Sequence, residues 1–497
     1  MLVVSLLTVL GGLSLLFLLQ RLRSSPSSSP DKSVALVVLG DIGRSPRMLY
    51  HAQSFASSGY NTHIVAYRGS KPPMQLADIP NVRFVYLPTP LGWISGLPRP
   101  LFLLFAPFKV VVGAFDLLRA LGWTLEVPPS YIFLQNPPAI PTLPVVQLAA
   151  FLRGSKVIID WHNTGYSMLA LRLREQHPVV KLARFIEHTF GRSAYAHLCV
   201  SDAMKAQLQR DAGLRGRVLT FHDRPPSTFR RLDESECHEL FSRLPLLSTI
   251  SFPASSVFAN ASLPNHPLSP TLFTSPSGTL LPSRPALVVS ATSWTADEDF
   301  TILLRALSVY EKAARACSMG AGGLRRKEGQ AGGKLPRLVV VITGKGAGKE
   351  AFEKEVRDLE AGWECVRVRT AWLAIEDYPR LLGSADLGVS FHTSTSGIDL
   401  PMKVVDMFGC DLPALALDFP CLNELVKDGK NGRIFRTAED LADQLIDLLC
   451  NFPRPFPSPI DTLRAGIEQV SYGGSENGEK WGSWEENWDR VVRPLLV

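Results

Sequence analysis

Residues 385–409, ADLGVSFHTSTSGIDLPMKVVDMFG, combine the features of a strand, a polar loop and a helix in succession. An apolar run of strand length (385–390) leads into a polar loop, and Pro401 then opens an amphipathic helix over residues 402–409. Proline suits the first turn of a helix, and the small residues before it leave backbone amides free at the positive end of the helix dipole. A buried strand, a Ser/Gly loop and a helix in this order are typical of one unit of a parallel α/β sheet.

The same alternation extends along the chain in both directions. In the second half, strands are predicted at residues 286–291, 338–342, 366–368, 385–390 and 413–417, with helices around 297–317, 349–360, 378–383, 402–409 and 438–450. In the first half, strands are predicted at residues 34–39, 63–66, 82–87, 131–134, 157–160 and 197–200, with helices around 46–58, 101–121, 143–152 and 179–191. This order predicts two Rossmann-like domains, each a doubly wound parallel sheet.

The length of the chain supports two cores. Its 497 residues, 46% of them hydrophobic, exceed the roughly 250 to 300 residues of a single core. The predicted organisation is a transmembrane anchor (1–23), a tether (24–32), an N-terminal domain (33–245), a Ser/Pro-rich linker or insertion (246–285), a C-terminal domain (286–480) and a C-terminal crossing segment (481–497).

Charge and cysteine content narrow the class of protein. The net charge of +6 is spread along the chain without the dense basic runs of a nucleic-acid groove, so nucleic acid is not expected as a partner. Seven scattered cysteines without a C-x-x-C pair indicate free thiols in a reducing compartment. No cluster has the spacing of metal ligands, and no bound metal is expected.

The first residues predict a membrane anchor. Residues 1–19 carry no charge, and at about 1.5 Å per residue such a helix just spans a hydrocarbon core of roughly 30 Å. A cleaved signal peptide is the alternative, but it would need positive charge before the apolar stretch. Arg21, Arg23 and Lys32 all follow that stretch, so the globular part is expected in the cytosol.

Two loops of the first half follow predicted strands, where ligands bind in such sheets. Asp41 lies in the turn Gly-Asp-Ile-Gly-Arg-Ser-Pro (40–46), which is explained equally well by a site and by a capped turn. Asp160 and His162 lie in the loop DWHNTGY (160–166). Polar and aromatic groups gathered there favour sugar binding, and either Asp160 or His162 could accept a proton.

Two loops of the second half favour a diphosphate. Gly344, Lys345 and Gly346 follow a buried strand, but Thr343 and Glu350 stand where a nucleotide-triphosphate loop needs Gly and Ser or Thr. The loop can still form a diphosphate site in which backbone amides bind the phosphates and Lys345 supplies a point charge.

The loop at 392–401 offers the amides of Ser396 and Gly397 at the helix mouth. Lys403 could neutralise phosphate charge there. Asp406 follows about two turns after Asp399 and on the same side, where it could accept hydrogen bonds from ribose hydroxyls.

These residues resemble those of a known family. The resemblance lies in VVLGDIGRSPRMLYHA (37–52), LQNPP (134–138), IDWHNTGYS (159–167), SATSWTADEDF (290–300), VITGKG (341–346), DYPRLLGSADLGVS (377–390) and STSGIDLPMKVVDMFGC (394–410). Through the joint occurrence of these motifs in this order, the chain resembles the chitobiosyldiphosphodolichol β-mannosyltransferases. The stretches before Pro285 and before Leu335 are longer than expected for that family, but they fall between the motifs.

The resemblance implies a GT-B fold, in which the two Rossmann-like domains face across a cleft. GDP-mannose, as a co-substrate with no tightly bound cofactor, is expected in the C-terminal domain, with Ser293 and Trp294 added to the nucleotide-sugar site. The implied acceptor is dolichyl-diphosphate chitobiose, which receives a β1,4-linked mannose at the cytosolic face of the endoplasmic reticulum during assembly of the N-glycan precursor. Other transferases of that assembly are further candidate partners.

Inversion in one displacement needs a general base, and Asp41 is the first candidate, with Asp160 and His162 in reserve. A GT-B enzyme with another GDP-mannose or UDP-sugar donor and a non-catalytic membrane protein with the same fold are the alternatives. Trp294 or Trp372 could pack near guanine or mannose, although tryptophan more often packs in a core. The apolar stretch 97–123, interrupted by prolines and charges, is either an element that dips into the membrane surface or a packed helix.

Overall fold

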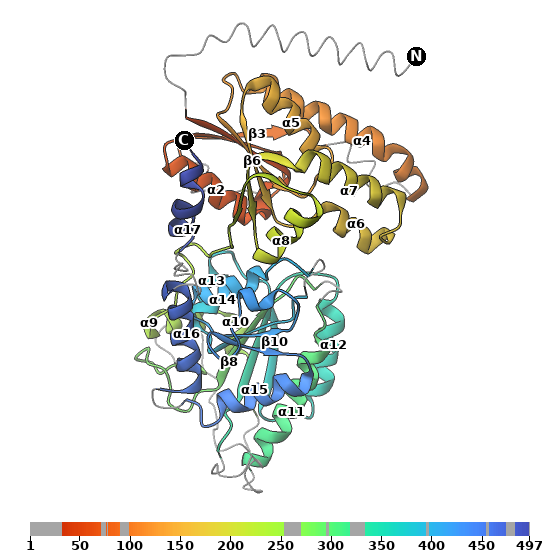
Figure 1. Cartoon of the computed structure of the whole chain (residues 1–497). Helices are drawn as coiled ribbons and strands as arrows, with labels where there is room; N and C mark the ends of the chain where they lie inside the picture. Colours follow the sequence, from red (N-terminus) through yellow and green to blue (C-terminus); the bar gives the residue numbers. More distant parts are fainter. Residues whose placement is uncertain are drawn as a thin grey trace. The chain divides into compact units, whose positions relative to one another are not determined.

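The computed structural model describes residues 32–70, 76, 78–89, 99–252, 270–294, 298–318, 333–393, 397–453, 457–473 and 483–496. The chain divides into two compact units, the first made of Met1–Asp223 with Trp488–Val497 and the second of Arg224–Asn487 (Figure 1). Among the described residues, no helix has both the length and the apolar character to cross a membrane. The anchor predicted at residues 1–23 lies outside the described residues.

The first unit is built on a seven-stranded sheet in the order β3-β2-β1-β4-β5-β6-β7. All neighbouring strands are parallel. The strands are β1 (Ser33–Asp41), β2 (Asn61–Tyr67), β3 (Val82–Leu87), β4 (Tyr131–Asn136), β5 (Lys156–Trp161), β6 (Ser193–Cys199) and β7 (Arg215–Thr220). The chain begins at β1 and runs first to one edge and then to the other, so the topological switch point lies between β1 and β4.

Helices cover both faces of this sheet. They are α2 (Pro46–Ser57), α4 (Arg99–Arg119), α5 (Thr142–Arg153), α6 (Gly165–Leu173), α7 (Pro178–Gly191) and α8 (Asp202–Asp211). Right-handed crossovers place α2 on one face and α4 to α8 on the other, and Figure 1 shows α4, α5 and α7 together, away from α2.

The carboxyl end of the chain contributes to the first unit. Within α17 (Trp484–Val491), Trp488 is buried against Phe55 and its ring N–H donates to Nδ1 of His51 (3.1 Å). The hydroxyls of Tyr131 and Tyr195 donate to the carbonyl of Leu495 (3.3 and 2.9 Å). The last residues therefore complete the core on the α2 side.

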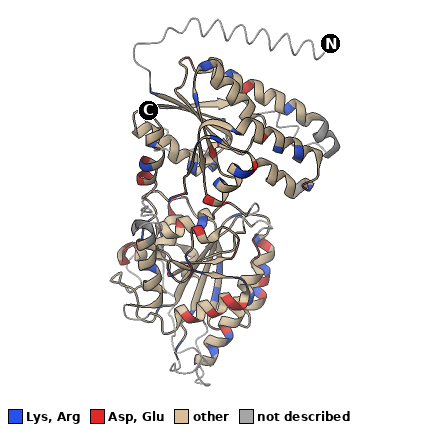
Figure 2. Cartoon of the chain, in the orientation of Figure 1, with Lys and Arg blue, Asp and Glu red and all other residues tan. Residues whose placement is uncertain are grey.

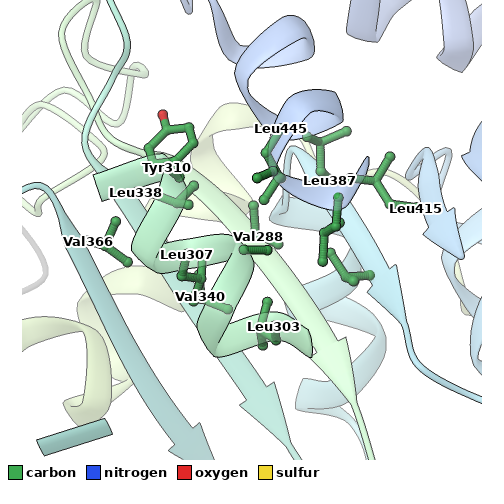
Figure 3. Packing of buried hydrophobic residues seen from close by; sticks show 14 of the residues in the cluster. Val288, Leu303, Leu307, Tyr310, Leu338, Val340, Val366, Leu387, Leu415 and Leu445 are labelled. Atoms are coloured by element: carbon green, nitrogen blue, oxygen red, sulfur yellow. The ribbon is translucent and has the colours of Figure 1, made fainter. Parts of the chain in front are cut away.

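The second unit has a six-stranded parallel sheet in the order β10-β9-β8-β11-β12-β13. The strands are β8 (Ala286–Ala291), β9 (Leu338–Thr343), β10 (Val366–Ala371), β11 (Leu387–Ser390), β12 (Ala414–Leu417) and β13 (Gly432–Phe435). The helices are α9 (Glu234–Arg243), α10 (Pro245–Ser248), α11 (Thr301–Ser318), α12 (Lys349–Glu360), α13 (Asp377–Ser384), α14 (Met402–Gly409), α15 (Ala438–Leu449) and α16 (Pro459–Gly473). Leu303, Leu307 and Tyr310 of α11 pack with Val288 and Val340 of the sheet (Figure 3).

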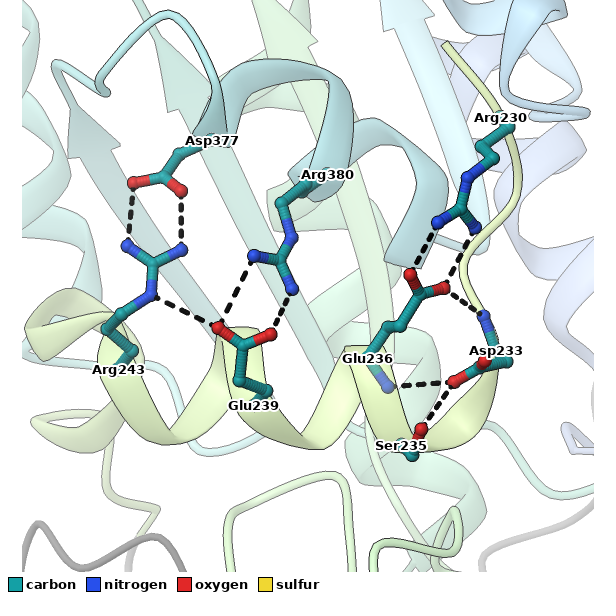
Figure 4. Close-up of polar contacts among 8 residues, drawn as sticks. All are labelled: Arg230, Asp233, Ser235, Glu236, Glu239, Arg243, Asp377 and Arg380. Carbon is teal, nitrogen blue, oxygen red and sulfur yellow. Dashed lines mark hydrogen bonds and ion pairs between the residues drawn. The ribbon is translucent and has the colours of Figure 1, made fainter. Parts of the chain in front are cut away.

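Residues 224–245 belong to the second unit, although the sequence pattern places them in the first domain. The reason is a row of ion pairs that ties α9 to α13 (Figure 4). Arg243 donates to both carboxylate oxygens of Asp377, and Arg380 pairs with Glu239. Asp233 and Glu236 form a reciprocal capping box at the start of α9, which fixes the helix in place.

The sequence pattern does not predict the two edge strands β7 and β13. Their sequences, RGRVLT and GRIF, contain Arg and Gly where a central strand would be apolar. Edge strands have only one neighbour and are often short or charged, so they lack the signal of a buried strand.

Candidate functional site

Asp41 caps a turn at the end of β1. Its carboxylate accepts hydrogen bonds from the amide of Gly43 (3.0 Å) and from the amide and hydroxyl of Ser70 (2.9 and 2.8 Å), and Arg44 lies 3.5 Å away. Burial acts to raise the pKa of Asp41, but these hydrogen bonds and the Arg44 charge lower it on balance. A carboxylate with this many donors is a weak base that holds the β1 and β2 loops together.

Asp160 is the fully buried centre of a charged cluster in the first unit. Arg47 of α2 forms two hydrogen bonds to its carboxylate, both 2.8 Å, and a third to Asp223 (2.7 Å). Burial acts to raise the pKa of Asp160, but Arg47 and His162 hold it well below its usual range. Asp160 is therefore a permanent anion with both oxygens engaged, and it is poorly suited to accept a proton.

His162 is the partly exposed member of this cluster. Its Nε2 lies 2.7 Å from Oδ2 of Asp160, and 23% of its side chain is exposed. Since Asp160 is ionised, the N–H group at Nε2 donates a hydrogen bond to the carboxylate. In the neutral ring the second nitrogen, Nδ1, then has a lone pair, as in an Asp–His pair that acts as a general base.

His51 is a buried member of the cluster that contacts Asp160. It is fully buried, its Nε2 lies 3.4 Å from Oδ2 of Asp160, and its Nδ1 accepts from Trp488. Burial lowers the pKa of His51 to about 4 in spite of the neighbouring carboxylate of Asp160, so the ring is neutral at pH 7. A line of contacts thus runs from Trp488 through His51 and Asp160 to His162.

A buried glutamate holds the loop that contains His162. Glu187 of α7 accepts hydrogen bonds from the amides of Gly165 and Tyr166 (3.0 and 3.1 Å) and from the side chain of Asn136 at the end of β4 (2.6 Å). The amide of His162 donates to the carbonyl of Asn136 (2.9 Å). The position of α7 therefore determines the position of the loop.

The predicted donor residues lie at the carboxyl ends of β8, β9 and β11, around the switch point of the second sheet. The loop after β9 packs directly on the loop after β8. Gly344 has φ +146°, and a Cβ there would lie 1.8 Å from the carbonyl oxygen of Thr292. A Cβ on Gly346 would lie 2.2 Å from the carbonyl oxygen of Ser293, so neither position admits a side chain. Lys345, between them, is exposed.

Glu298 joins the loop after β8 to the helix after β11. This carboxylate accepts hydrogen bonds from the hydroxyl of Thr292 (2.5 Å) and the amide of Ser293 (3.1 Å), and it pairs with the amine of Lys403. Only 1% of the Glu298 side chain is exposed, against 22% for Lys403. The Lys403 charge is thus partly compensated. The sequence pattern does not single out Glu298, which lies within the motif at residues 290–300.

The two tryptophans have different surroundings. Trp294 is buried in the hydrophobic core between Phe300 and Phe352, at the unusual backbone angle φ +54°. Its Nε1 is buried without a hydrogen bond among the described residues. Its backbone thus belongs to the loop, whereas its ring packs in the core. Trp372 follows β10 and is 71% exposed.

The mouth of α14 is described from Gly397 onward, and Ser396 lies outside the described residues. Gly397 has φ +72°, and Pro401 is the N-cap of the helix. Asp399 precedes the helix, 3.7 Å from Nε2 of His392. Asp406 accepts a hydrogen bond from the hydroxyl of Tyr378 (3.1 Å) and so faces α13. Burial, with Asp406 beside it, raises the pKa of Tyr378 well above its usual value.

Both units match glycosyltransferase families. Residues 43–223 match the glycosyl transferase 4-like domain, and residues 326–451 match glycosyl transferases group 1. The chain is similar to HepE of Anabaena in complex with UDP and glucose (TM-score 0.56, 14% identity, 93% of this chain and 99% of that one). It is also similar to sucrose-phosphate synthase from Thermosynechococcus elongatus (TM-score 0.55, 11% identity, 93% and 99%). The two parallel sheets and the family matches define a glycosyltransferase of GT-B-like fold.

Relatives of higher identity define the family more narrowly. The chain is 41% identical to the chitobiosyldiphosphodolichol beta-mannosyltransferase of Mus musculus, over 99% of its own length and 94% of that protein. It is also 41% identical to the human protein of the same name, over 94% and 93%. The chain belongs to the chitobiosyldiphosphodolichol β-mannosyltransferase family. A further relative, 42% identical over 93% of this chain and 96% of that protein, is the UDP-glycosyltransferase TURAN of Arabidopsis thaliana.

Proposed function

We propose that this protein transfers mannose from GDP-mannose to chitobiosyldiphosphodolichol and forms a β1,4-linkage. The observation that carries the proposal is the similarity to enzymes of that name over nearly the whole chain. The similarity includes both units, and so both sets of strand-end loops. We place the reaction at the cytosolic face of the endoplasmic reticulum, where an anchor at residues 1–23 would hold the enzyme.

On this proposal the donor binds at the switch point of the second sheet. The amides of Gly344, Gly346, Ser396 and Gly397 would hold the diphosphate, and the exposed Lys345 would supply positive charge. We assign Lys403 mainly to positioning, because Glu298 already pairs with it. Asp399 and Asp406 remain candidates for the ribose hydroxyls. The proposal gives no part to a bound metal, so activity should persist when divalent ions are chelated.

We propose His162, rather than Asp41, as the general base. The acceptor hydroxyl oxygen attacks C1 of mannose, the bond from C1 to the phosphate oxygen breaks, and GDP leaves with the bonding electrons. Nδ1 of His162 takes the hydroxyl proton, and the Asp160 carboxylate at Nε2 stabilises the imidazolium that forms. This choice is supported by the low pKa and the hydrogen-bonded state of Asp41.

The test is donor profiling with the purified full-length protein and a chitobiosyl-diphosphate lipid acceptor. We expect transfer of mannose from GDP-mannose, with and without chelator, and no transfer from UDP-sugars. The name of the Arabidopsis relative makes a UDP-sugar transferase the second candidate function. Transfer from a UDP-sugar alone would favour that candidate, and transfer from no donor would favour a non-catalytic protein.

A further inference from the structure

The outer surface of α4, α5, α6 and α7 in the first unit is unusually apolar. The helices pack in a row, α4 on α5, α5 on α7 and α7 on α6. Each exposes large apolar side chains to solvent. Examples are Phe108 and Phe115 on α4, Phe151 on α5, Leu171 on α6, and Leu182 and Phe185 on α7. Phe151 is 77% exposed and Phe185 is 65% exposed.

The second unit provides an internal comparison. Its exposed large hydrophobic residues, among those that the structure describes, are Val309, Trp372 and Ile375. Val309 lies on α11, whereas Trp372 and Ile375 lie in one loop after β10. Soluble surfaces commonly carry a few exposed apolar residues of this kind, whereas a patch that continues over four adjacent helices marks a binding surface.

Positive charge accompanies the apolar patch. The four helices contain seven Lys or Arg residues and two acidic residues, of which Glu187 is buried under the His162 loop. Among the described side chains, Arg119, Lys181 and Arg184 are exposed, whereas Arg153 donates to backbone carbonyls. Figure 2 shows these helices mostly uncharged, with scattered basic residues. An apolar surface with basic residues at its margin is the pattern of a protein face that lies on an anionic membrane.

A cationic pocket lies at the edge of the patch, along α7. It is an open cavity of about 430 Å³ lined by Lys181, Arg184, Phe185, His188 and Arg192, among others. Lys181, Arg184 and Arg192 are exposed. His188 also lines the cavity, and its Nε2 is buried without a hydrogen bond among the described residues. Three cations around a cavity of this size suit a phosphate group.

We propose that this face of α4 to α7 lies on an anionic phospholipid bilayer, with a lipid phosphate in the pocket formed by Lys181, Arg184 and Arg192. The apolar residues beside the pocket would then enter the acyl boundary while the cations remain at headgroup level. Such a membrane contact is separate from the transferase reaction and independent of the identity of the donor.

Charge complementarity argues for a bilayer over a second copy of this chain. Two copies joined through this face would bring like charges together at the margins of the contact. The excess of basic over acidic residues on the four helices instead matches a surface of opposite charge. Docking would also fix α7, whose inner face holds the loop of His162 through Glu187.

The test uses the full chain on vesicles. The reporter responds to insertion of the α7 surface into the bilayer and not to attachment of the protein through an anchor. Leu182→Cys receives an environment-sensitive fluorophore, and Val309→Cys, an exposed apolar position in the second unit, is the matched control. Vesicles contain phosphatidylcholine with about one third phosphatidylserine, a composition that gives a strongly negative surface. Acyl chains carrying a quencher then report insertion. We expect several-fold stronger quenching at position 182 than at position 309.

A charge variant tests the pocket separately. Lys181→Gln should reduce the ratio of docked to undocked protein about five-fold on anionic vesicles, the effect of one basic residue at such a surface. Lys354→Gln, an exposed lysine on α12, should leave that ratio unchanged. Equal quenching at positions 182 and 309 would overturn the proposal. So would docking that is as strong on pure phosphatidylcholine and indifferent to Lys181→Gln. Circular dichroism of each variant verifies its fold.

Discussion

At the scale of single residues, the main feature is a histidine whose partners are all fixed. His162 donates to Asp160, Asp160 is held by Arg47, and His51 lies beneath them. The sequence predicts Asp160 and His162 as site residues because they lie at the carboxyl end of a buried strand, and the structure extends that strand, β5, to Trp161, so that Asp160 lies within it. It does not reveal Arg47, which is 113 residues away from Asp160 and joins it only in the folded chain.

We predict that His162→Ala lowers kcat about 100-fold to 10,000-fold, the range of a lost general base, with little change in the KM for GDP-mannose. Added imidazole should restore part of the activity. Asp41→Asn keeps a hydrogen-bond acceptor for the turn, so its kcat should fall by less than about ten-fold. Steady-state kinetics on both variants provide the comparison. A larger loss in Asp41→Asn than in His162→Ala would make Asp41 the base.

A second prediction concerns pH and His51. The pKa of this ring is about 4 in the folded protein and 6.5 in the unfolded chain, so the unfolded chain binds more protons between these values. Stability therefore falls as the pH is lowered from about 6.5 towards 4, by about 2 kcal/mol between roughly pH 7 and 5. His51→Gln keeps a donor and an acceptor but does not titrate.

The measurement is urea unfolding of the first unit at both pH values, read by pulse proteolysis. The variant should lose about 2 kcal/mol less than the parent over this interval. His63, His188 and His197 also have lowered pKa values, chiefly through burial, and they act equally in both proteins. If parent and variant lose the same free energy of unfolding between the two pH values, the assignment to His51 is refuted.

At the scale of elements, the donor site depends on loops that fit each other. The sequence predicts β8, β9, β11 and the start of α14 closely, because buried strands followed by Gly-rich loops give a strong signal. The sequence also predicts Gly344 and Gly346 as site residues, but it does not show why glycine is required at these positions. Because Gly344 and Gly346 have no side chain, the backbone of the loop after β8 can pack against them. This contact joins segments about 50 residues apart in sequence.

We predict that Glu298→Gln weakens GDP binding about ten-fold or more. The change removes the charge partner of Lys403 and loosens the amide of Ser293. Glu311→Gln is the matched control, because Glu311 is also buried and accepts from backbone amides, but at the start of β10. Calorimetric titration with GDP should show reduced affinity only in Glu298→Gln. Equal losses of affinity in the two variants would indicate a general loss of stability instead.

At the scale of the whole molecule, the chain returns to its first unit at the end. A crossing segment over 481–497 is predicted from its amphipathic pattern, and the structure assigns residues from Trp488 onward to the first unit. The start of the second unit at Arg224 could not be predicted, because the ion pairs between α9 and α13 join residues more than 130 positions apart.

We predict that Trp488→Ala destabilises the first unit by about 3 to 5 kcal/mol, the usual cost of removing a buried tryptophan. Trp484→Ala is the control, since Trp484 is equally buried on the same helix but belongs to the second unit. Hydrogen exchange should increase in peptides from β1 and β4 in the first variant and in peptides of the second unit in the second. Faster exchange in the same peptides in both variants would contradict the division into units.

We claim that both units take part in one inverting mannosyl transfer. The most direct measurement is the linkage of the product made from GDP-mannose and a chitobiosyl-diphosphate lipid, read from the anomeric carbon–proton coupling and from digestion by β-mannosidase. We predict a single β-linked mannose on the second N-acetylglucosamine, formed by the parent protein and lost in His162→Ala. An α-linked product, or a β-linked product formed at the parent rate by His162→Ala, would contradict the claim.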